Sequence, residues 1–133
     1  MANWRDELIE AVKTKAEREA EEAERQRKRV AEALSTAELA LRGAEEALAF
    51  AHERVAEKGQ SSSYEGGKLT VGALSLVVEL DRSTAALKVS YLESKPREFD
   101  FARDRHIAPA DVEEYVGRRI VELVRAAQKA TPW

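Results

Sequence analysis

The chain has 133 residues, of which 35% are charged and 6% aromatic, with a formal net charge of −3 at pH 7. This length allows one domain with an extension, and the charge balance gives no general electrostatic reason to bind nucleic acid. The absence of cysteine excludes disulfides, thiolate nucleophiles and cysteine-ligated metal sites. No run of about 18 apolar residues is present to span a membrane, and the charged N-terminus is unlike a signal peptide, so we expect a cytoplasmic protein.

Residues 1–58 are rich in alanine, glutamate, arginine and leucine and contain no proline, which predicts one long helix. Apolar residues recur in it at alternating spacings of three and four, the heptad repeat that is typical of a left-handed coiled coil. Of the two apolar positions of the heptad, position a is filled by large residues and position d mostly by alanine. We therefore predict a rod that pairs with a second copy of the chain. The predicted partner or dimer interface consists of Val30, Leu34, Ala37, Leu41, Ala44, Leu48, Ala51 and Val55.

Two other structures fit the same stretch. The apolar face can pack on the chain's own sheet instead of on a partner helix. Ser35 and Glu38 match a helix-capping box, which would begin a new helix and fold the rod into a hairpin. No glycine, proline or asparagine lies just before Ser35, and the heptads continue through it, so a straight rod is favoured. The repeat does not distinguish parallel from antiparallel pairing.

The tip of the predicted rod carries a short apolar patch, although the stretch that follows it is very polar. Such a patch is a candidate anchor for another protein, or it packs on the partner chain at the far end of an antiparallel pair. The patch consists of Trp4, Leu8, Ile9 and Val12.

One basic cluster lies further along the rod and is a candidate contact for phosphates or other anions. Glutamates directly upstream are spaced to pair with it, which favours a neutralised, solvated face. We therefore expect a protein partner more than nucleic acid. The cluster consists of Arg25, Arg27, Lys28 and Arg29.

The remainder of the chain predicts a linker and a small domain. Residues 59–67 are rich in serine and glycine, which is typical of a flexible linker. Residues 68–133 then contain three alternating stretches separated by turn residues, which predict a three-stranded antiparallel β-meander with a bulge at Gly72. Pro109 begins a final amphipathic helix that would cover the apolar face of the sheet.

The fold class expected is thus α+β, with a long N-terminal coiled-coil helix, a three-stranded antiparallel β-meander and a C-terminal amphipathic helix packed on the sheet. No nucleotide-binding or nucleophile motif is present, and His52 and His106 lack metal-site spacing. Asp100, Asp104 and His106 share one polar loop, for which capping roles are favoured. We predict no enzyme activity and no catalytic, cofactor or metal site.

The function expected is that of a non-catalytic homodimeric interaction protein: a scaffold, adaptor or assembly factor. One alternative is an escort or chaperone-like protein that holds a partner peptide in a groove between the sheet and the last helix. A second alternative is a nucleic-acid binder, because the order helix, three strands, helix resembles the small nucleoid-associated YbaB-type proteins. That resemblance lies in element order alone and transfers no residue roles.

Overall fold

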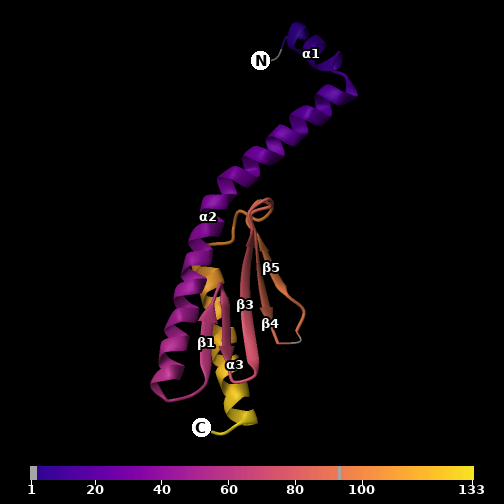
Figure 1. Cartoon of the computed structure of the whole chain (residues 1–133). Helices are drawn as coiled ribbons and strands as arrows, with labels where there is room; N and C mark the ends of the chain where they lie inside the picture. The colour runs from indigo at the N-terminus through magenta and orange to yellow at the C-terminus, as the bar shows by residue number, and fades with distance from the viewer. Residues whose placement is uncertain (1–2, 93) are drawn as a thin grey trace.

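The computed structural model describes residues 3–92 and 94–133 and has two layers, a pair of helices on an antiparallel sheet (Figure 1). The α+β class and the C-terminal helix packed on the sheet are confirmed. In chain order the elements are α1 (Trp4–Ala11), α2 (Lys15–Glu57), β1 (Ser62–Glu65), β2 (Lys68–Val71), β3 (Leu74–Asp81), β4 (Ala86–Tyr91), β5 (Arg97–Asp100) and α3 (Pro109–Ala130).

The sheet has five strands in the order β1-β2-β3-β4-β5, so the prediction of three strands is wrong. The stretch predicted as one bulged strand is a hairpin of β2 and β3, in which Val71 pairs with Leu74. Gly72 has φ +60, which permits a two-residue turn where a bulge was expected.

The first strand, β1, lies in the segment 59–67 that was predicted to be a linker. Gly66 and Gly67 connect it to β2 with φ values of +55 and +76, the combination that a tight type I′ hairpin turn requires. Tyr64 packs against the hydrophobic core, and the Oγ of Ser62 lies 2.8 Å from Nδ1 of His52. Ser62 thereby attaches the edge strand to α2.

One face of the sheet is apolar and the other is polar. On the apolar face the strand register places Leu69 opposite Leu76, and Val78 opposite Val89. On the other face Lys88 lies between Glu79 and Glu98 in a row of exposed charges. This alternation is typical of an antiparallel sheet that is covered on one side only.

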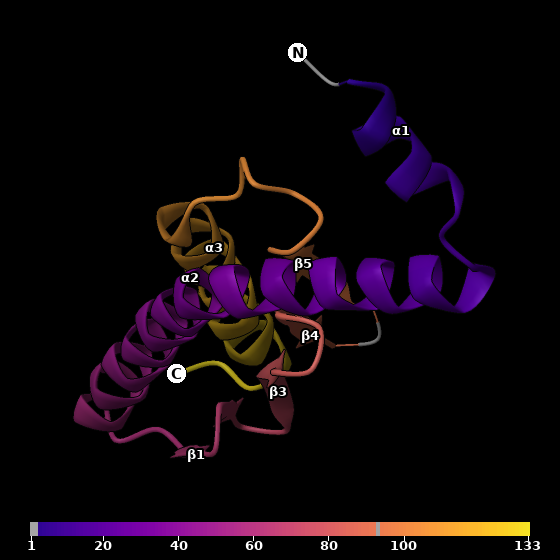
Figure 2. The same ribbon diagram turned by 90° about the horizontal axis from the view of Figure 1, so that it is seen from above.

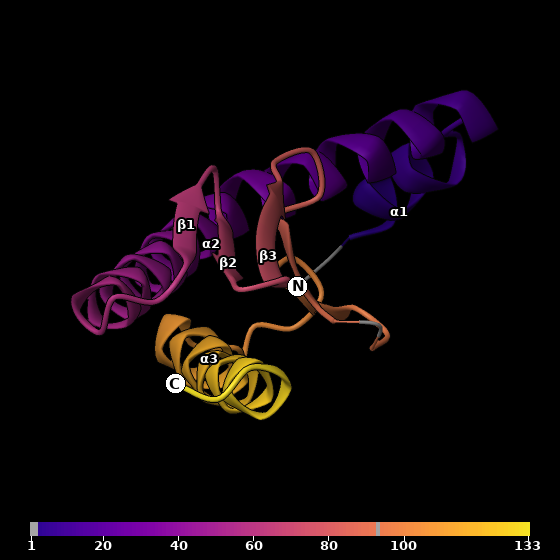
Figure 3. The same cartoon turned by 60° about the horizontal axis from the view of Figure 1, so that its bottom comes forward.

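The cover is shared by α3 and the C-terminal half of α2, which run in the same direction and contact each other and the sheet (Figures 1 and 3). Alanines on α2 allow a close approach, and Gly43 faces the side chain of Glu113. The buried residues of the two helices are Ala37, Ala40, Ala44, Leu48, Ala51 and Val55 on α2, and Val112, Val116, Ile120, Leu123 and Ala127 on α3.

The predicted single helix over 1–58 is divided into α1 and α2 near Thr14, and α1 turns away from the axis of α2 (Figure 2). Thr14 is extended, and its hydroxyl accepts a hydrogen bond from the backbone of Glu17 at 3.1 Å, which caps α2. Since α1 buries no residue, no packing opposes this cap.

At Ser35 the helix continues, and the hairpin considered for this position does not form. Ala37 and Ala40 are fully buried directly after it, so interruption of the helix would remove them from the core. The Ser35 hydroxyl donates instead to the carbonyl of Glu32 at 3.4 Å. Within the described parts of the chain, no helix is both long and apolar enough to cross a lipid bilayer.

Candidate functional site

The stripe predicted to form a seam between chains is covered by the chain's own sheet and α3. Val30, Leu34 and Leu41 pack partly buried against that core. A partner helix can therefore reach Ala37, Ala44 and Leu48 only by displacing parts of the fold, and a homodimer stays a prediction. The buried members are Ala37, Ala44, Leu48, Ala51 and Val55.

An apolar groove of about 720 Å³ lies between the C-terminal part of α2 and most of the length of α3. Phe50 and Val121, one from each helix, are 59% and 47% exposed there. Ile120, Val124 and Trp133 also line the groove. The sequence showed Phe50 to be outside the heptad seam but did not identify its partners on α3.

Charged side chains line the same groove. Arg54, Lys58 and Arg125 contribute three cations, and Glu46 and Glu113 contribute two acids. The Arg54 guanidinium lies 4.9 Å from the Phe50 ring centroid, and its Nη1 lies 3.0 Å from Glu57 Oε2. An apolar floor with charges around it is the arrangement that binds one face of an amphipathic helix.

The predicted tip patch is located on α1, and all of its side chains are exposed. Trp4 is 66% exposed and stacks with Arg5, whose guanidinium carbon lies 5.3 Å from the ring centroid. Asn3 caps the helix through hydrogen bonds from two backbone amides. The exposed apolar members are Trp4, Leu8, Ile9 and Val12.

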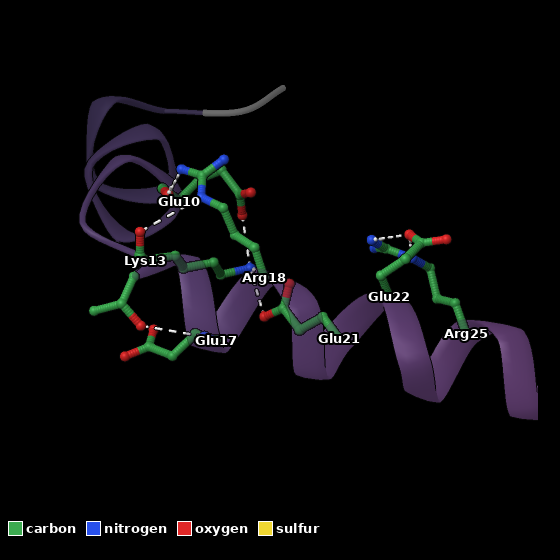
Figure 4. A network of polar contacts seen from close by, with 8 residues as sticks. Glu10, Lys13, Glu17, Arg18, Glu21, Glu22 and Arg25 are labelled. Atoms are coloured by element: carbon green, nitrogen blue, oxygen red, sulfur yellow. Dashed lines mark hydrogen bonds and ion pairs between the residues drawn. The ribbon is translucent and has the colours of Figure 1, made fainter.

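Ion pairs connect α1 to α2 at the bend between them (Figure 4). Lys13 Nζ lies 2.7 Å from Glu10 Oε2 and 2.8 Å from Glu21 Oε1, and Arg18 donates to the Glu10 carbonyl at 3.0 Å. The hydrogen bond and charge of Lys13 lower the pKa of Glu10, and hydrogen bonds to Glu10 and Glu21 raise the pKa of Lys13. These contacts orient α1.

The basic cluster on α2 is partly neutralised. Arg25 lies 2.8 Å from Glu22, and Arg27 lies 3.5 Å from Glu24, as expected for a solvated helix face. The hydrogen bond and charge of Glu22 raise the pKa of Arg25.

The structure also forms an arginine cleft that the sequence analysis missed, where α2 passes the loop between β5 and α3. Arg29, Arg103 and Arg105 line this cleft of about 490 Å³ together with Gln26 and Ala102. The spacing of Arg103 and Arg105 was the available signal, but nothing in the sequence placed that loop beside α2.

The polar loop residues have capping roles. Asp100 accepts hydrogen bonds from the backbones of Ala102 and Arg103, and Asp104 accepts one from the backbone of His106. Among residues 3–92 and 94–133, no three or more histidine and acidic side chains are grouped as metal ligands.

No protein-family model matches the chain, and no curated protein or solved structure matches it significantly.

Proposed function

We propose that the protein is a non-catalytic, homodimeric interaction protein of the scaffold, adaptor or assembly-factor type. The observation that supports this proposal is the open apolar groove between α2 and α3. Contiguous exposed apolar surface with a polar rim marks interaction sites in water-soluble proteins. Phe50 and Val121 are the anchors we assign to the interface, because large apolar side chains near the centre of a contact dominate its energy.

The test is absolute molar mass in solution by light scattering. We expect the wild type to be a dimer at roughly 1 to 100 µM, and Phe50→Asp or Val121→Asp to be monomeric, since each places a charge in the groove. Both positions are exposed, so circular dichroism should show an unchanged fold. Leu92→Asp is the matched control, because Leu92 is 42% exposed and lies outside the groove. A wild type that is monomeric throughout this range would contradict the proposal.

The escort alternative uses the same groove with a peptide from another protein. The groove expected between sheet and last helix is filled by core residues such as Leu76 and Leu123, so the surface between α2 and α3 replaces it. This alternative is favoured if the wild type is monomeric and binds an amphipathic helical peptide, and if Phe50→Asp abolishes that binding.

The arginine cleft supports a second candidate, contact with a nucleic-acid backbone. Three guanidinium groups line one cleft, of which Arg103 lies 3.6 Å from Asp100. Duplex DNA binding measured by fluorescence anisotropy should then weaken with salt, and Arg29→Gln and Arg105→Gln should each reduce the salt slope by about one. Arg54→Gln, in the apolar groove, is the control. A salt slope unchanged by both variants excludes the cleft as the contact.

A further inference from the structure

We infer that α1 of one copy occupies the α2–α3 groove of a second copy, and that the second copy does the same in return. This inference rests on the proposed homodimeric function and names the two surfaces that form the dimer. Each surface lacks cover in the described chain: Phe50 and Val121 are more than two-fifths exposed in the groove, and α1 buries none of its residues.

The first step is that α1 would gain stability from a partner. It has eight residues, whereas isolated helices shorter than about 12 residues are marginal in water. Trp4, Leu8 and Val12 recur at a spacing of four and therefore form one stripe. A short helix with an uncovered apolar stripe is the ligand that a helix-binding groove accepts.

The second step is that the groove of the same chain is out of reach. Along α2, the distance from Lys15 to Phe50 is about 50 Å at 1.5 Å per residue. Figure 1 shows α1 and the C-terminal end of α2 at opposite ends of the molecule. The groove that receives α1 must therefore belong to another copy.

The third step is charge. Between Trp4 and Ala11, α1 carries Asp6 and Glu7 against Arg5, and Glu10 is paired with Lys13, so the first turn of α1 is acidic. The groove is lined by three cations, Arg54, Lys58 and Arg125, against the two acids Glu46 and Glu113, so its lining has an excess of one positive charge. Acidic and basic surfaces that meet at an interface steer association and fix its register.

The fourth step is geometry. The contacts of Lys13 with Glu10 and Glu21 orient α1 before binding, which lowers the entropy lost on association. If two α2 helices lie antiparallel, each α1 reaches the other copy's groove, and one two-fold axis relates both contacts. This arrangement is complete with two chains, and it covers α1 and the α2–α3 groove of both copies.

The test uses the absence of native cysteine. Full-length Ala11→Cys is mixed with full-length Gln128→Cys and treated with a short bismaleimide, and peptide mass spectrometry identifies the linked residues. Both positions are exposed, one on α1 and one beside the groove. Ala11→Cys mixed with Lys88→Cys is the control, since Lys88 is exposed on the polar face of the sheet. We expect linkage of residue 11 to residue 128 and none to residue 88.

Light scattering on Leu8→Ser supplies the second measurement, and we expect its dimer to be about tenfold weaker than that of the wild type. A wild-type dimer that is unchanged by Leu8→Ser and gives no link between residues 11 and 128 would overturn this inference but leave the homodimer intact. A wild-type monomer would overturn both.

Discussion

Gly67 lies closer to a neighbouring strand than a side chain permits. A Cβ built there would lie 2.5 Å from the carbonyl oxygen of Val78, and φ is +76. We expect Gly67→Ala to lower the free energy of unfolding by about 3 kcal/mol, because it combines backbone strain with a steric clash. Gly66→Ala should cost about 1 kcal/mol, since it meets the strain without the contact. Urea denaturation of both variants measures the difference in their free energies of unfolding. Equal losses would show that the close approach of Val78 to residue 67 adds nothing to the cost of the substitution.

Gly117 and Gly43 lie within helices, and we expect their replacement by alanine to raise the free energy of unfolding. A Cβ at Gly117 meets no atom within 4 Å, so Gly117→Ala should raise the free energy of unfolding by about 1 kcal/mol through helix propensity alone. At Gly43 the Cβ would lie 3.4 Å from Glu113 Oε2, which leads us to expect a smaller gain. Thermal denaturation compares the two. A loss of stability at Gly117 would contradict the open space seen there.

At the scale of elements, Thr14–Glu17 and Ser35–Glu38 both match the S/T-x-x-E pattern in the helical part of the sequence, and only Thr14 caps a helix. Thr14 begins a helix because no buried residue lies near it in the sequence, and local hydrogen bonding decides the backbone. Ser35 does not, because the helix after it supplies core residues. Local patterns alone cannot rank the two sites, since the difference between them is tertiary packing.

The strand β1 was missed for a different reason. Ser62 and Ser63 have the composition of a linker, and the strand is formed through pairing with β2. The signal that could have identified it is the pair Gly66 and Gly67, which separates two short stretches by a two-residue turn. The β2–β3 hairpin was also missed, because its turn at Gly72 was taken for a bulge. The hairpins of β3 with β4 and of β4 with β5 were predictable from alternation, and their apolar residues do line one face.

The bend between α1 and α2 should depend on pH. The pKa of Glu10 is lowered in the folded chain by its contact with Lys13. The contribution of Glu10 to stability is therefore complete above its unfolded pKa and is lost as the pH falls through its folded pKa. From neutral pH to about pH 3 we expect α1 to lose its fixed orientation. Spin labels on Asp6→Cys/Ala31→Cys, diluted with unlabelled protein, measure the distance distribution.

Lys13→Gln is the control for this prediction, because it removes the cation that joins Glu10 to Glu21. Its distance distribution should already be broad at neutral pH and change little on acidification. A sharp wild-type distribution at pH 3 would show that the ion pairs do not hold the bend.

At the scale of the whole molecule, the period of the apolar stripe was predictable but its partner was not. Spacings of three and four place Leu34, Leu41 and Leu48 on one side of a helix whether that side faces another chain or a sheet. The alanines between these leucines are compatible with either partner, because small residues allow close approach to another chain and to a sheet alike. The structure places this stripe on α3 and the sheet, and leaves the off-seam Phe50 exposed.

Because Leu48 is buried within the chain and Phe50 is exposed, substitutions at the two positions should respond differently to protein concentration. Leu48 is fully buried within one chain, so Leu48→Ala should lower the free energy of unfolding by about 2 to 5 kcal/mol at every protein concentration. Phe50→Ala should have little effect in dilute solution, where the monomer dominates, and should lower stability only where the dimer is populated. Chemical denaturation over a wide concentration range separates the two. If the loss at Leu48 vanished on dilution, that residue would belong to a seam between chains, and the assignment of the stripe to the chain's own core would fail.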